Sequence, residues 1–391
     1  MTASLTEAPT SAQASAPTSA QASGPTSGPT SGPTSGPTSG PTSAPESAKL
    51  GFGARFTQHM VLARWTPGTG WSPLELVPHA ALELSPAAMA LHYGQAVFEG
   101  LKAYPRRDGS IALFRPDVNA ARFNRSAVRL AMPDMPVEVF TEACEIVVRA
   151  DASEVPRGPG QSLYLRPFMI AVEPSLGVRP AQEYLFAVIA SPVDHFFADG
   201  YQSIDVWCAP DHIRAAPGGT GAAKCAGNYA GSLAAKAEAL SRGCHEVLWL
   251  DSREHRWVEE LGAMNFFCVT RDESGTPLLA TPRLSGTILA GNTRGSLIEL
   301  AASLGIRTVE RPVSLAELTA GDGRVTEAFA CGTAASVVPI GAVTGEAGRS
   351  VIGDGRPGEI TTRLRDELAA VHYGEKADLF GWMHPVAPSV P

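Results

Sequence analysis

Lys224 lies in a stretch of mostly small residues, GGTGAAKCAGNYAGSL at 218–233. Tyr229 follows it closely, and the carboxylate of Glu260 comes after a strand-like run, EVLWLD at 246–251. Small neighbours allow a flat cofactor to lie against the backbone, and a lysine amine held there can form a Schiff base with an aldehyde. A carboxylate further along can pair with a pyridinium nitrogen. Together these residue types indicate a pyridoxal phosphate site.

Local composition alone is equally compatible with a surface lysine in a glycine-rich loop. The GGTG segment also suggests a nucleotide-binding loop, but the GxxxxGK[ST] spacing is not met and Cys225 follows the lysine. A nucleotide-binding protein would bind ATP and be colourless, which distinguishes this alternative from a pyridoxal phosphate protein.

Phosphate binding is better placed in the segment LAGNTRGSLIEL at 289–300, which predicts the beginning of a helix. Free backbone N–H groups and the positive end of the helix dipole would hold a dianion there. The turn CGTAASVV at 331–338 adds a hydroxyl, and a helical arginine could add positive charge. An ordinary N-cap and a solvated arginine are the structural alternatives. The residues concerned are Gly291, Asn292, Thr293, Thr333 and Arg122.

Composition excludes several classes of protein. The chain has 391 residues and a net charge of −8, without a block of Lys or Arg that would favour nucleic acid. No apolar run approaches the ~18 residues that span a bilayer. The six cysteines are scattered without a CxxC pair, which argues against disulfides and a metal site and for a reducing cytoplasm.

The chain is expected to divide into a tail and two domains. Residues 1–48 repeat PTSG, lack Lys and Arg and do not have the pattern of a signal peptide, so we predict a disordered tail without a catalytic role. We predict a smaller N-terminal domain at 49–192, an interdomain loop at 193–202 and a larger cofactor-binding domain at 203–391. Strands interspersed with helices indicate an α/β or α+β architecture.

The elements that must position these residues follow from periodicity and breaker residues. Residues 92–104 are predicted to form a strand pair or a strand plus turn. The predicted helices are 116–132, 136–150, 228–241, 293–304 and 361–373, and the further predicted strands are 162–172, 184–190, 203–209, 246–251 and 265–270.

The order of these motifs resembles the fold-type IV pyridoxal phosphate aminotransferases, and more narrowly the branched-chain amino acid aminotransferases. The resemblance covers about residue 55 to Met383. It is carried by LHYGQAVFEGLKAY, LFRPDVNAARFNRSA, SLYLRPFMIAVEPSLGVRP, RAAPGGTGAAKCAGNYA and FACGTAA. It implies a two-domain α/β (α+β) fold, with the cofactor in the cleft between the smaller N-terminal and the larger C-terminal domain.

The resemblance also implies roles toward pyridoxal 5'-phosphate. Lys224 matches the lysine that holds the cofactor covalently and then moves the proton in catalysis. Glu260 matches the acid at the pyridine nitrogen, Tyr229 the tyrosine at the phenolic oxygen, and Leu289 the residue that packs on the ring. The matches to phosphate contacts are Arg122, Gly291, Asn292, Thr293 and Thr333.

On the substrate side, the resemblance implies a side-chain pocket and a carboxylate site. Phe98, Tyr164 and Arg166 match the pocket, and Arg166 is placed to meet the distal carboxylate of glutamate. The backbone amides of Thr333 and Ala334 would hold the α-carboxylate. Tyr93 and Val178 match residues that reach in from the neighbouring subunit, which implies that a homodimer is the smallest active unit. The alternative is that both residues simply pack in the core of their own chain.

The expected reaction is a reversible ping-pong amino transfer between Leu, Ile or Val and 2-oxoglutarate, in a biosynthetic cytoplasmic enzyme. The family's usual LPG turn has Ala290 in place of proline and Asn292 in place of the apolar residue that follows. An aminotransferase for aromatic or modified amino acids in secondary metabolism is therefore an alternative. The remaining alternatives are a D-amino acid aminotransferase, an aminodeoxychorismate lyase and a non-catalytic relative.

Overall fold

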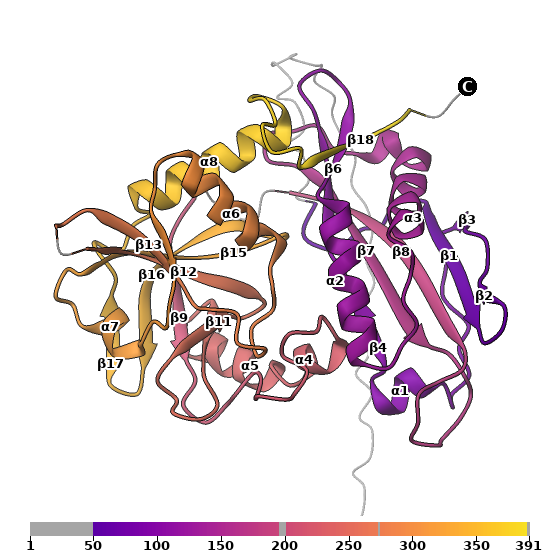
Figure 1. The fold of residues 1–391 in the computed structure, drawn as a ribbon, viewed down its shortest axis with the longest axis horizontal. Helices are drawn as coiled ribbons and strands as arrows, with labels where there is room; N and C mark the ends of the chain where they lie inside the picture. The colour runs from indigo at the N-terminus through magenta and orange to yellow at the C-terminus, as the bar shows by residue number, and fades with distance from the viewer. Residues whose placement is uncertain (1–49, 195–200, 273, 389–391) are drawn as a thin grey trace, which may run out of the picture. The chain divides into compact units, whose positions relative to one another are not determined.

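Two nine-stranded β-sheets form the framework of the protein (Figure 1). The structure, a computed structural model, describes residues 50–194, 201–272 and 274–388, all within one compact unit. The predicted tail at 1–48 and the central part of the predicted interdomain loop, 195–200, lie outside the described residues. The predicted domain bounds remain a prediction.

The first sheet is antiparallel throughout, in the order β18-β6-β5-β7-β8-β1-β2, with β3 on β1 and β4 on β7. Its last strand comes from the other end of the chain, since Met383 of β18 pairs with Phe114 of β6. The strands are β1 (His59–Thr66), β2 (Gly70–Trp71), β3 (Glu75–Pro78), β4 (Ala96–Phe98), β5 (Leu101–Pro105), β6 (Ile111–Phe114), β7 (Ser162–Ala171), β8 (Tyr184–Val193) and β18 (Met383–Val386).

Helices α2 (Pro116–Arg129) and α3 (Val137–Ala150) pack against each other and against this sheet (Figure 1). The predicted helix at 116–132 corresponds to α2, whose Phe123 is fully buried and contacts the rings of Phe140 and Phe186. A short helix, α1 (Met89–Tyr93), precedes β4, so the predicted strand region at 92–104 begins inside a helix. Gly94, with a φ of 60°, ends α1 in the left-handed conformation that glycine favours.

The second sheet has the order β11-β10-β9-β16-β15-β12-β13-β14, with β17 on β16. Because β11 also pairs with β12, six of these strands close into a ring, which leaves their edges paired as in a barrel. The strands are β9 (Ile204–Cys208), β10 (Glu246–Leu250), β11 (Val258–Leu261), β12 (Met264–Arg271), β13 (Pro277–Thr281), β14 (Thr308–Glu310), β15 (Val325–Gly332), β16 (Ser336–Gly345) and β17 (Gly348–Val351).

The helices of the second half include one departure from prediction. The expected single helix at 228–241 is wrong, because the structure has two helices that break at Gly231 and Ser232. The Ser232 hydroxyl donates to the Tyr229 carbonyl at 2.7 Å, which competes with the helical hydrogen bonds. The helices are α4 (Ala226–Ala230), α5 (Leu233–Ser241), α6 (Asn292–Ser303), α7 (Leu315–Thr319) and α8 (Glu359–Tyr373).

All six cysteines are free and buried. Within residues 50–194, 201–272 and 274–388, no helix is long and apolar enough to cross a membrane. No group of His, Cys, Asp and Glu side chains in the same ranges could hold a metal ion.

Candidate active site

Lys224 is held between the two halves of the fold. Its backbone N–H donates to the Ser126 hydroxyl of α2 at 2.8 Å, and its carbonyl accepts from the backbone N–H of Phe98 in β4 at 3.0 Å. The loop that carries the lysine is therefore anchored on the first sheet and its helix. The amine Nζ lies 3.0 Å from the Tyr229 hydroxyl and 5.0 Å from the centre of the Phe98 ring.

Most of the predicted site residues line one cavity of about 240 Å³ next to Lys224. Sequence reasoning therefore placed residues from both halves of the chain at one site. The predicted residues that line the cavity are Phe98, Arg122, Tyr164, Arg166, Lys224, Tyr229, Leu289, Gly291, Asn292, Thr293, Thr333 and Ala334.

One end of the cavity is the N-terminus of α6, whose first backbone N–H groups lack partners within the helix and attract an anion. Gly291 precedes this helix, and a side chain there would collide with the side-chain oxygen of Asn265. The side-chain amide of Asn292 donates to the side-chain oxygen of Asn119 at 2.8 Å, so the backbone N–H of Asn292 rather than its side chain is left for the anion.

Arg122 reaches this end from α2, but its guanidinium is bound to a carboxylate that sequence reasoning missed. Its Nε and Nη2 donate to Glu99 at 2.7 and 2.8 Å, and its Nη1 donates to the Ala290 carbonyl at 3.0 Å. Burial raises the pKa of Glu99, but Arg122 and Asn119 outweigh it and hold the pKa below its ordinary value. The signal in the sequence is a charged residue inside the apolar run AVFEGL.

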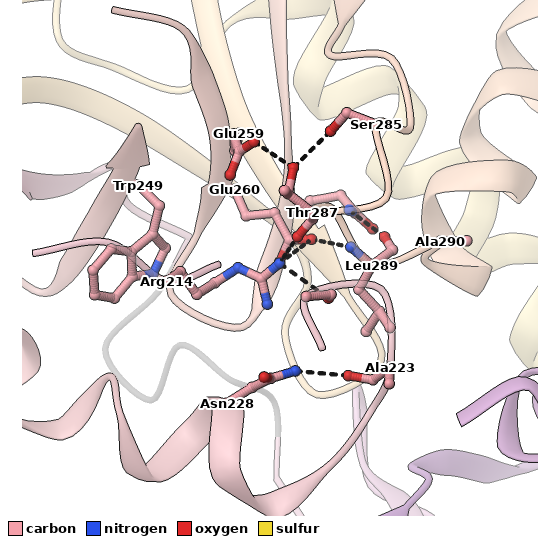
Figure 2. A network of polar contacts seen from close by, with 12 residues as sticks. Arg214, Ala223, Asn228, Trp249, Glu259, Glu260, Ser285, Thr287, Leu289 and Ala290 are labelled. Atoms are coloured by element: carbon pink, nitrogen blue, oxygen red, sulfur yellow. Dashed lines mark hydrogen bonds and ion pairs between the residues drawn. The ribbon is translucent and has the colours of Figure 1, made fainter. Parts of the chain in front are cut away.

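Glu260 is only 2 % exposed and lies behind Leu289, which lines the cavity. Its carboxylate accepts a hydrogen bond from the backbone N–H of Leu289 and lies 3.4 Å from the guanidinium of Arg214 (Figure 2). Burial raises the pKa of Glu260 to about 7, although Arg214 and the Leu289 N–H act in the opposite direction. Glu260 therefore titrates close to neutral pH and can exchange a proton with a partner.

The other end of the cavity is aromatic and cationic. The Arg166 guanidinium donates to the Tyr164 hydroxyl at 3.0 Å and lies 4.8 Å from the centre of the Phe98 ring. Arg166 Nε is buried and has no hydrogen-bond partner among the described residues. Gly100 leaves room for Tyr164, because any side chain there would collide with the phenol.

Thr333 and Ala334 form the turn of the hairpin between β15 and β16, where Gly332 pairs with Ser336. Lys102 of β5 donates from Nζ to the Ala334 carbonyl at 2.9 Å and so ties this turn to the first sheet. Burial lowers the pKa of Lys102 to about 8. The turn therefore has an amine beside its backbone, which suits a carboxylate.

Tyr93 and Val178 do not line the cavity of their own chain. Both are at the surface, with Val178 85 % exposed, so they are not packed in the core. The Tyr93 hydroxyl donates to the Leu176 carbonyl at 2.5 Å, which joins α1 to the loop that follows β7.

This arrangement fits a flat aromatic cofactor that carries a phosphate. The N-terminus of α6 and the Thr333 hydroxyl suit the phosphate, and Leu289 offers an apolar surface for a ring. Glu260 is buried beside Leu289, where a carboxylate can face a ring nitrogen, and Lys224 offers an amine to an aldehyde.

Comparison with known proteins agrees with this chemistry. The model of the family described as "Amino-transferase class IV" matches residues 96–343. The chain therefore belongs to the class IV aminotransferases.

Among its relatives, the chain is 50% identical over 343 residues to a probable branched-chain-amino-acid aminotransferase of Streptomyces coelicolor, covering 87% of this chain and 93% of the relative. It is 49% identical to the branched-chain-amino-acid aminotransferase of Mycolicibacterium smegmatis, covering 86% and 92%. Among solved structures, the branched-chain amino acid aminotransferase from Escherichia coli matches with a TM-score of 0.67 at 30% identity, covering 83% of this chain and 99% of that one.

Proposed function

We infer that the protein is a pyridoxal phosphate-dependent branched-chain-amino-acid aminotransferase, which transfers the amino group between Leu, Ile or Val and 2-oxoglutarate. One observation carries the inference. A single cavity gathers the Lys224–Tyr229 pair, the N-terminus of α6 and the aromatic–cationic pocket around Arg166, with Glu260 directly behind Leu289. Relatives at 42–50% identity over most of the chain have the same activity in their names.

The residues that would hold the cofactor are assigned as follows. When bound, pyridoxal phosphate supplies an electron-accepting ring that stabilises negative charge at the substrate α-carbon. Leu289 would support the ring, and the carboxylate of Glu260 would keep its nitrogen protonated. The phosphate would be held by Arg122, Gly291, Asn292, Thr293 and Thr333.

Lys224 would hold the cofactor aldehyde and, once released, move the proton that the reaction requires. Lys224 lines the cavity, so its amine would be within reach to take the proton from the substrate α-carbon. The Tyr229 hydroxyl, 3.0 Å away, would orient this amine and the phenolic oxygen of the cofactor.

The substrate pocket must accept both an apolar and an acidic side chain. The Phe98 and Tyr164 rings would face the branched side chain, whereas Arg166 would meet the distal carboxylate of glutamate or 2-oxoglutarate. Arg166 has the buried, unpaired Nε that such a role requires, and its long side chain can turn toward or away from the pocket. The amides of Thr333 and Ala334 would hold the α-carboxylate common to all substrates.

We further propose a cytoplasmic homodimer in which Tyr93 and Val178 complete the site of the neighbouring subunit. Both lie at the surface, together with the exposed apolar side chains of Leu91 and Leu176. A group of exposed apolar residues on one helix and one loop is a common feature of a surface that a second subunit covers.

Lys224→Ala tests the assignment of the central amine. The variant should lose measurable transamination while it still binds pyridoxal phosphate noncovalently, because the other cofactor contacts remain. The test compares turnover and the visible spectrum of wild type, Lys224→Ala and the surface control Lys376→Ala. Substantial turnover by Lys224→Ala would contradict the assignment.

The substrate class is tested by adding single amino acids to the cofactor-loaded protein and following the loss of its visible absorbance. Fast loss with Ile, Leu, Val and glutamate is expected. Slow reaction with these and fast reaction with an aromatic or D-amino acid would leave the cofactor assignment intact and overturn the substrate.

A further inference from the structure

Arg214 lies where three segments of the site meet (Figure 2). Its side chain is 8 % exposed, and its Nη2 donates to the carbonyls of Gly221, at 3.1 Å, and Thr287. The same nitrogen lies 3.4 Å from the Glu260 carboxylate. One guanidinium thus contacts the loop that carries Lys224, the segment that carries Leu289, and the carboxylate beside them.

The two loops touch directly beneath this guanidinium. A side chain at Gly221 would collide with the carbonyl oxygen of Thr287 and lie 2.5 Å from the side chain of Ala215. The backbone at Gly221 is close in sequence to Lys224, and Thr287 is close to Leu289. A displacement of Arg214 would therefore change the position of the amine relative to the ring-supporting residue.

Arg214 is also the cation that acts on two buried carboxylates, Glu259 and Glu260. Glu259 is 7 % exposed, accepts a hydrogen bond from the Thr287 hydroxyl and has one oxygen without a partner among the described residues. The charged or titratable groups that act on Glu260 are Arg214, Lys224, Glu259 and the Cys331 thiol.

The charge of Arg214 matters because burial opposes the ionised form of both acids. Burial raises the pKa of Glu260 to about 7 and raises that of Glu259, and Arg214 lowers both. The Lys224 amine cannot replace this cation, since the proposed function uses it in the reaction. Arg214 is thus the fixed cation that favours the anionic form of Glu260 against the effect of burial.

We propose that Arg214 is a positioning residue of the aminotransferase reaction, which fixes the anionic Glu260 toward the cofactor ring nitrogen and locks the Lys224 loop to the Leu289 segment. The proposal rests on the proposed function for the presence of the cofactor. It requires arginine rather than lysine, because all three contacts are made by Nη2 at the tip of the guanidinium, and a lysine ammonium ends one bond closer to the backbone.

The test uses the cofactor-loaded protein, reconstituted with pyridoxal phosphate labelled with ¹⁵N in the ring. The ¹⁵N chemical shift reports directly whether the ring nitrogen is protonated. In Arg214→Gln, we expect this nitrogen to lose its proton at a pH at least about one unit lower than in wild type, a tenfold shift in the equilibrium. The rate constant of the leucine half-reaction should fall more than about tenfold, while the dissociation constant of leucine changes less than about threefold.

Two variants separate charge, geometry and local packing. Arg214→Lys should keep the ring nitrogen protonated as in wild type but slow the half-reaction about tenfold, because the shorter side chain no longer reaches the carbonyls of the two loops. Thr287→Val removes the hydroxyl that contacts Glu259 but keeps the carbonyl that Arg214 binds, and it should leave the ¹⁵N titration unchanged.

An Arg214→Gln protein with the ¹⁵N titration and half-reaction rate of wild type would overturn the proposal. If Arg214→Gln does not fold, an Arg214→Lys protein identical to wild type in rate would overturn it instead. Wild-type protein that takes up cofactor but does not react with branched-chain amino acids would overturn only the proposed substrate, because the ¹⁵N comparison is made without substrate.

Discussion

Glu99 and Glu260 are both almost completely buried close to residues that line the candidate cavity, yet their environments differ. Glu99 is 0 % exposed and accepts two hydrogen bonds from Arg122, one from Asn119 at 2.7 Å and one from the Gly100 N–H at 3.1 Å. Glu260 is 2 % exposed and accepts one backbone N–H, with a guanidinium at 3.4 Å.

The pKa values of the two acids therefore move in opposite directions, down for Glu99 and up to about 7 for Glu260. Burial is common to both, so the number and charge of hydrogen-bond donors decides the result. The saturated Glu99 is built to hold Arg122 in place. Glu260 lacks donors, which leaves it capacity for one more, such as a protonated ring nitrogen.

The largest expected effect comes from breaking the saturated pair. Glu99→Gln leaves the buried guanidinium of Arg122 without its counter-charge, and loss of one partner of a buried ion pair costs about 3–5 kcal/mol. The free energy of unfolding of the cofactor-free protein, measured with urea, should fall by this amount. A loss below about 1 kcal/mol, similar to that of the exposed control Glu346→Gln, would contradict the structural role of Glu99.

The matched change at the other acid should affect catalysis instead. Glu260→Gln removes the charge that would face the ring nitrogen, and we expect the half-reaction rate to fall about 10²–10³-fold, as for other preorganised electrostatic contacts. Stopped-flow absorbance measures this rate.

Unlike Glu99→Gln, which should destabilise the protein, Glu260→Gln should stabilise it. Because the pKa of Glu260 is raised in the folded protein, ionisation of this side chain lowers the free energy of unfolding of the wild type as pH rises from about 4.5 to about 7. The cofactor-free variant should thus gain stability relative to wild type across that range, and no further above it. A constant difference between pH 4.5 and 7 would show that burial does not control this carboxyl group.

His372 extends the comparison to a buried base. Its ring stacks on Tyr104 at 4.3 Å, and burial, with Lys102 and Arg106 nearby, lowers its pKa to about 3. A lowered histidine pKa means that its contribution to stability is present above about pH 6.5 and is lost as pH falls toward 3.

Between pH 6.5 and 4.5 this loss amounts to about 2–3 kcal/mol. His372→Phe keeps the aromatic stack and should show an acid-induced loss of stability that is smaller by this amount. Denaturation curves at both pH values measure it, and equal losses in the two proteins would exclude a buried neutral histidine.

The smallest effect concerns the arginine in the cavity that has no carboxylate partner among the described residues. Arg166→Ala should raise the Michaelis constant for glutamate and 2-oxoglutarate about tenfold more than that for leucine, since only the acidic substrates supply the missing partner. Steady-state kinetics with the two substrate classes measure the ratio. Equal changes for both would mean that Arg166 does not recognise the distal carboxylate.

Sequence patterns predicted those site residues that lie in loops or helices formed by their own neighbours in the chain. The small-residue loop around Lys224, the helix that begins after Gly291 and the helix that carries Phe123 were all predicted, and the family resemblance ordered them. Their assigned roles toward the cofactor remain predictions. Glu260 was predicted as a carboxylate that follows a strand-like run, and the resemblance then assigned it to the pyridine nitrogen.

Features that depend on distant partners were not predictable. Glu99 is meaningful only with Arg122 on another element, and Arg214 only with a carbonyl 73 positions away at Thr287. Short, partly exposed strands such as β2 and β3 lack an apolar run and were missed. The break near Ser232 depends on a side-chain hydrogen bond that propensity alone does not reveal.

The return of β18 to the first sheet has a consequence for how the protein is made. Strand β6 is synthesised early, but its partner, Met383–Val386, follows all the other described strands of both sheets in the chain. Until then one side of β6 presents unpaired backbone groups, which can pair with other nascent chains. The first sheet is therefore completed only after the strands of the second sheet have been made, and a stop codon shortly before residue 383 would release a chain with a permanently open, aggregation-prone edge.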